Sequence, residues 1–127
     1  MAVGLSPVNM ANKILSVYKA TSFTGITTVY MQLHTGDPGL NGTANLSAVT
    51  TRNAVNWNTP SGGSMTLSSI AGYSMTTSET IAYVSFWDAS TVGNFLQSSS
   101  LTASQAVING STLNFTVITL SYAPLAA

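Results

Sequence analysis

The amino-acid sequence predicts a mainly β fold: an antiparallel β-sandwich or barrel-like domain preceded by a short N-terminal helix. Three observations carry this prediction. Roughly six to eight short segments have the composition of strands, turn signals separate them about every 8–15 residues, and one capped helical pattern stands at the start of the chain. The 127 residues fit a single domain, with an N-terminal arm and helix over 1–25 and a β-domain over 26–127.

The helix is predicted close to the N-terminus. Ser6 can cap it, and Pro7 suits its first position, where the missing N–H costs nothing. Apolar residues then recur at helical spacing, at Val8, Ala11, Leu15 and Tyr18.

Residues 27–35 form the first predicted strand, because apolar and polar residues alternate there. Val29, Met31 and Leu33 lie on one face, and Tyr30, Gln32 and His34 lie on the other. The turn signal at 36–39, which contains Asp37, ends this strand. Residues 40–52 are polar and irregular, so they predict a long exposed loop, a feature that is often functional.

Further strands are predicted over 53–58 and 64–69, on either side of a Gly-rich turn at 61–63. Residues 80–87 give the strongest strand pattern. Both faces of this segment are apolar, which indicates a strand that is central in its sheet or covered on both sides. A turn is predicted at 88–93.

Three strands are predicted in the C-terminal part of the chain. A short one covers 94–97, and a second covers 101–108 and ends at the turn dipeptide Asn109-Gly110. The third covers 113–122, with two faces: Leu113, Phe115 and Val117 opposite Asn114, Thr116, Ile118 and Leu120.

Charge is scarce in this chain. Only 5% of the residues are charged and the net charge is zero, whereas a typical soluble domain carries about 25% charged residues. Hydroxyls supply the polarity instead, from 18 Ser and 18 Thr. Such a surface favours association with other protein, and it offers no basic stripe for nucleic acid. The alternative is a secreted or halotolerant domain that happens to be charge-poor. No apolar run predicts a membrane span.

The sequence predicts no catalytic residue, no metal site and no cofactor. His34 is the only histidine, and neither a GxSxG elbow nor a cluster of ligands accompanies it. It is therefore interpreted as a side chain on the outer face of a strand, near a turn. Asp37 is interpreted as a turn residue. A carbohydrate-binding platform of Trp57, Trp87, Tyr30 and Tyr83 is a weaker alternative, in which Trp57 is the best candidate because it borders a loop.

Several motifs resemble one family. They are YMQLHTGDPGLNGT at 30–43, TRNAV at 51–55, SGGS at 61–64, SFWDA at 85–89, LTA at 101–103 and PLAA at 124–127. Together they are similar to small virion structural proteins of tailed phages that infect mycobacteria and related actinobacteria, described as capsid decoration, head-fibre or tail-associated proteins. The family carries no catalytic residues to transfer.

The resemblance implies a non-enzymatic capsid decoration protein on the head surface of the virion, made in the cytoplasm of the bacterial host. Its expected partners are the major capsid protein and further copies of itself, with a trimer as the candidate assembly. A tail-associated subunit and a receptor- or carbohydrate-binding domain are the alternatives. Expected assembly contacts lie in the N-terminal arm, the 40–52 loop and the strand after it: Val3, Leu5, Leu40, Asn41, Leu46, Arg52 and Trp57.

Overall fold

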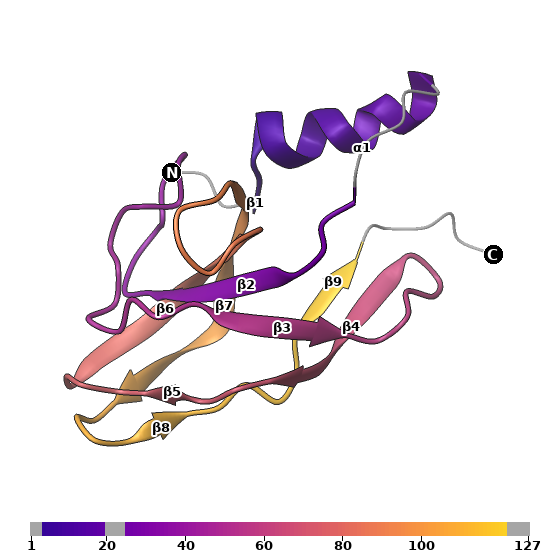
Figure 1. Cartoon of the computed structure of the whole chain (residues 1–127). Helices are drawn as coiled ribbons and strands as arrows, with labels where there is room; N and C mark the ends of the chain where they lie inside the picture. The colour runs from indigo at the N-terminus through magenta and orange to yellow at the C-terminus, as the bar shows by residue number, and fades with distance from the viewer. Residues whose placement is uncertain (1–3, 20–24, 122–127) are drawn as a thin grey trace.

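The computed structural model describes residues 4–19 and 25–121. It shows a seven-stranded antiparallel sheet that curls into a half-barrel, in the order β1-β7-β6-β2-β3-β4-β9, beside a two-stranded ribbon of β5 and β8 (Figure 1). The strands are β1 (Gly4–Leu5), β2 (Val29–His34), β3 (Asn53–Trp57), β4 (Ser64–Ile70), β5 (Tyr73–Ser74), β6 (Glu79–Trp87), β7 (Phe95–Val107), β8 (Thr112–Leu113) and β9 (Thr119–Ser121). The predicted fold class is confirmed.

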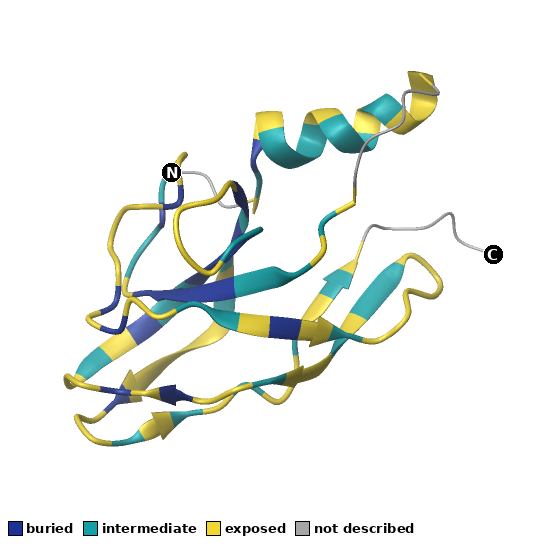
Figure 2. Cartoon of the chain, viewed as in Figure 1, coloured by how far each residue is buried: buried dark blue, intermediate teal, exposed yellow. Residues whose placement is uncertain are grey.

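One continuous helical segment follows β1. It consists of a π-helical turn, η1 (Pro7–Ala11), a short α-helix, α1 (Asn12–Ser16), and a 3₁₀ turn, η2 (Val17–Lys19). The Ser6 hydroxyl accepts a hydrogen bond from the Asn9 backbone N–H at 3.4 Å, which confirms the predicted cap. None of the residues of this helical segment, 7–19, is buried (Figure 2).

Strand β6 is central, as its two apolar faces predict. It pairs with β2 on one side and with β7 on the other. Because side chains alternate along a strand, Val84 and Phe86 point into the hollow of the half-barrel with Met31 and Leu33 of β2. This inner face holds the hydrophobic core, and Val55 of β3 continues it.

The opposite face of β2 and β6 is covered by the segment 40–52. The segment is an exposed loop over most of its length, as expected, but Gly42, Ser47 and Val49 are buried. Glu79 of β6 fixes it in place by accepting hydrogen bonds from the Ser47 hydroxyl and the Ala48 backbone N–H. Pairing with neighbouring strands does not cover the outer face of a strand inside a sheet. This segment covers that face of β2 and β6.

The C-terminal strands differ from the prediction. Residues 95–107 form one strand, β7, where two were expected, because a register shift between Ile81 and Tyr83 lets the pairing continue past an irregular stretch. The expected strand at 113–122 is divided into β8 and β9. Its alternation changes phase in between, so that Val117 is 78% exposed whereas Ile118 packs against the core.

Candidate functional site

The only histidine lies in a buried hydrogen-bond network. His34 Nδ1 is 2.8 Å from the Ala44 carbonyl oxygen, so this nitrogen donates, and Nε2 accepts from the Ser85 hydroxyl at 2.7 Å. The same hydroxyl oxygen accepts a hydrogen bond from Trp87 Nε1 at 2.8 Å. His34 and Ser85 are both 0% exposed.

This network positions the chain and offers no reactive group to solvent. Burial lowers the pKa of His34, which keeps the ring neutral and fixes its tautomer between a carbonyl and a hydroxyl. The Ser85 hydroxyl donates a hydrogen bond to the imidazole and accepts one from the indole N–H of Trp87. His34 lies on the outer face of its strand, as the sequence predicts, and the 40–52 segment covers its ring there.

Arg52 connects its own segment, 40–52, and the turn before β7 to the outer face of the sheet. Its guanidinium carbon lies 3.7 Å from the centroid of the Trp87 ring. Its Nε donates to Gln32 Oε1 at 3.1 Å, and Nη1 donates to the Val92 carbonyl at 2.7 Å. This expected assembly contact is therefore engaged within the chain, where its planar fork orders the turn that precedes β7.

Trp57 lies apart from Trp87 among the four aromatic residues considered for a carbohydrate platform. Trp57 lies on the inner side of the sheet and packs on Phe86, with ring centroids 6.2 Å apart. Trp87 is buried on the outer side, beneath Arg52. The Trp57 Nε1 atom is buried and has no hydrogen-bond partner among the described residues. Trp57, the best candidate by sequence, therefore packs within the inner side of the sheet.

Two of the expected contact regions meet at one edge of the molecule. Leu40 is 72% exposed and Asn41 is exposed beside it, and both border a shallow depression that Ser6 and Asn9 at the start of the helix also line. Leu5 is half-buried in β1, and Leu46 is 42% exposed near the end of β2. Val3 lies outside the described residues. The structure thus brings the loop and the N-terminal segment together.

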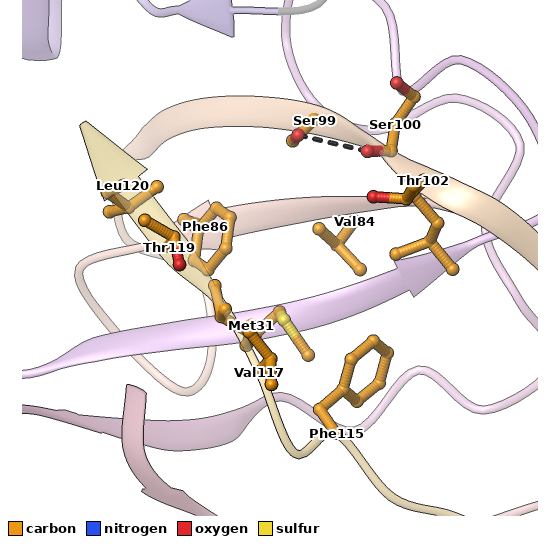
Figure 3. A pocket seen from close by; sticks show the side chains of 12 residues that line it. Met31, Val84, Phe86, Ser99, Ser100, Thr102, Phe115, Val117, Thr119 and Leu120 are labelled. Carbon is orange, nitrogen blue, oxygen red and sulfur yellow. Dashed lines mark hydrogen bonds between the residues drawn. The ribbon is translucent and has the colours of Figure 1, made fainter. Parts of the chain in front are cut away.

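A cavity that the sequence did not indicate lies on the open side of the half-barrel. It has a volume of about 190 Å³ between the inner face of the sheet, β7 and the segment that leads into β9 (Figure 3). Met31, Val84, Phe86 and Phe115 line it, and no charged side chain does. The sequence pattern does not indicate this cavity, because it predicts one regular strand over 113–122, and such a strand would not cross the opening of the half-barrel.

The described residues contain neither a metal-binding cluster nor a helix that could span a membrane. Within 4–19 and 25–121, no group of three or more His, Cys, Asp or Glu side chains could hold a metal ion. The helical segments in the same part of the chain fall short of the length and hydropathy of a membrane span.

Comparison with protein families gives one match. The model of the family described as podophage GP4 fiber I protein gp80 matches residues 6–123, which takes in the helical segment and strands β2 to β9. Comparison with curated proteins gives no significant match. The family description supports the virion part of the expected resemblance, and it names neither mycobacterial phages nor capsid decoration. The chain belongs to the podophage GP4 fiber I protein gp80 family and is a structural protein of a phage virion.

Proposed function

We propose that this protein is a subunit of a fibre associated with the phage tail, that it acts by binding other virion proteins, and that it is not an enzyme. The observation that carries the proposal is the family match over residues 6–123. Because the family is described as a fibre protein, the match favours the tail-associated alternative over capsid decoration.

The surface chemistry supports this function. The chain has three basic and three acidic residues and no net charge, so little electrostatic repulsion keeps copies apart. Several large apolar side chains are exposed, among them Leu40, Val92 and Ile108. In a repeated assembly many weak contacts of this kind add up, because each attached neighbour raises the effective concentration of the next contact.

The edge formed by Leu40 and Asn41 beside the start of the helix is our candidate for the contact with a neighbouring virion protein. It unites two segments that are far apart in the sequence, and Leu40 exposes most of its side chain there. Asn9 and Asn41 line the same depression as Leu40, so polar side chains adjoin this apolar one. An apolar centre with a polar rim is the usual composition of a protein–protein interface.

Locating the protein on the particle tests the proposal. Particles of the phage that encodes this chain are separated into heads and tails, both fractions are analysed by mass spectrometry, and intact particles are labelled with a specific antibody for electron microscopy. We expect the protein in the tail fraction and the label on fibres, with the major capsid protein as the marker for heads. Recovery on tail-less heads, at a copy number set by capsid symmetry, would overturn the proposal in favour of capsid decoration.

A further inference from the structure

Strand β7 runs well beyond its partner β1. β1 pairs with it only at Gln97 and Ser98, whereas β7 continues to Val107. In the part of the chain that the structure describes, no other strand pairs with this edge of β7. The backbone N–H and C=O groups along an unpaired edge can pair with an added strand, and folded proteins usually cover such an edge. The edge of β7 from Ser99 onward can therefore pair with a further length of strand.

The cavity of the half-barrel lies beside this free edge. Ser99 and Ser100 of β7 line it, as do Leu120 of β9 and the inner-face residues Val84 and Phe86 of β6 (Figure 3). Its volume is about 190 Å³, and no charged side chain lines it. A strand added to the edge of β7 would therefore place its inward side chains against an uncharged cavity.

The register of β1 indicates which segment reaches this position. Gly4 lies opposite Ser98 in an antiparallel pair, with a φ of +140° that glycine adopts readily. The same register, continued by one residue, brings Val3 opposite Ser99, and the two residues before Val3 follow along the same edge. Residues 1–3 lie outside the described part of the chain, and they directly precede the paired strand.

The residues at the start of the chain also have the alternation that this position requires. On its other side Ser99 pairs with Val84 of the inner face, and side chains directly opposite one another on antiparallel strands share a face. Val3 opposite Ser99 would therefore point inward. The opening sequence MAVGL has large apolar residues at 1, 3 and 5 and small ones at 2 and 4, so its large side chains share this inward face.

From these observations we propose that residues 1–3 extend β1 along the free edge of β7, so that Val3 packs into the mouth of the cavity of its own chain. The added length of strand narrows the open side of the half-barrel, where Val117 is 78% exposed. Val3 and Leu5, which the sequence indicated as contacts with a neighbouring subunit, then belong to the fold of their own chain. This inference is independent of the fibre proposal, and its test needs only the purified protein.

The first test compares two substitutions at neighbouring positions of the full-length chain. Val3→Asp would place a charge against the apolar cavity, so its urea midpoint should fall. The amides of residues 99–102 that face the free edge should exchange about tenfold faster, the change expected when one valine side chain is no longer buried. Ala2→Asp is the matched control: it puts the same charge on the outer face, opposite the exposed Ser100, and should behave like the wild type. No change in Val3→Asp, or equal changes in both variants, would overturn the inference.

The second test observes the contact directly in the wild type and needs no variant to fold. The methyl protons of Val3 should show nuclear Overhauser effects to the side chains of Val84 or Leu120, which line the cavity. A mixture of isotope-labelled and unlabelled chains distinguishes contacts within one chain from contacts between two. Effects seen only between differently labelled chains would overturn the inference, because the N-terminal residues of a second copy would then occupy the cavity. The absence of any effect between Val3 and the cavity would overturn it as well.

Discussion

His34 and Ser85 are joined by a buried 2.7 Å hydrogen bond between neighbouring strands, β2 and β6, on the outer face of the sheet. Through its other ring nitrogen, His34 also donates to the Ala44 carbonyl of the covering segment. One side chain thus connects two strands of the sheet to the loop that lies over them.

The stability of the fold should depend on pH through His34. Burial lowers the pKa of this ring below its ordinary value of 6.5, so between the two values the unfolded chain binds a proton that the folded chain does not. The free energy of unfolding should therefore have its full value above pH ~6.5. It should decrease as the pH falls below this value, by at most about 1.4 kcal/mol per pH unit. Urea unfolding between about pH 8 and pH 5 measures this slope.

The control is His34→Gln, because the glutamine amide can still donate and accept hydrogen bonds but does not titrate in this range. His34 is the only histidine and the chain has no cysteine, so side chains other than His34 contribute little between these pH values. A slope that persists unchanged in His34→Gln would contradict the assignment.

Arg52→Lys should destabilise the fold by about 1–2 kcal/mol although the charge is kept. Lysine cannot reproduce the planar fork that bonds Gln32 and the Val92 carbonyl, and it stacks less well on Trp87. Chemical unfolding followed by tryptophan fluorescence gives the change. The matched substitution Lys19→Arg, at an exposed cation, should leave stability unaltered. Equal stability of Arg52→Lys and the wild type would show that the guanidinium geometry is unimportant.

Tyr73→Phe should cost about 1 kcal/mol of unfolding free energy. The Tyr73 hydroxyl is buried and donates to the Met31 carbonyl at 2.6 Å, so the variant leaves that oxygen without this donor. Burial also raises the pKa of the Tyr73 hydroxyl above its usual value, and it stays a donor at every pH the fold meets. Thermal unfolding is the measurement, with Tyr18→Phe at an 88% exposed position as the control. Identical losses in the two variants would refute the bond's contribution.

Gly42→Ala should be more damaging than Gly62→Ala. Both glycines have positive φ angles, +71° and +59°, so an added Cβ costs about 1–2 kcal/mol of backbone strain at each. At Gly42 the Cβ would also collide with the ring of Phe95, whereas at Gly62 it would meet nothing within 4 Å. The clash should add about 1–3 kcal/mol at Gly42 alone. Denaturant titrations of the two variants measure the difference between their unfolding free energies. Equal destabilisation would mean that the loop moves freely away from Phe95.

Local sequence patterns determined the elements that depend only on neighbouring residues. The cap at Ser6 is present, and Asp37 forms the expected turn, in which its carboxylate accepts the Gly39 N–H at 2.9 Å. The apolar faces of β6 correctly placed that strand at the centre of the sheet. The motifs around residues 30–43 also indicated a virion protein, which the family match supports.

Tertiary structure decided which surfaces are covered. The alternation along 27–35 places His34 on the outer face of its strand, but only the tertiary structure shows that a segment beginning several residues later folds back over it. Likewise the register shift in β6 and β7 joined two expected strands, and the crossing of the half-barrel divided another. Val8, Leu15 and Tyr18 keep the apolar spacing that the sequence shows, yet their own domain packs on the other side of the helix. The periodicity of a sequence indicates which side chains prefer burial. What buries them depends on the pairing of distant segments, and no local pattern encodes that pairing.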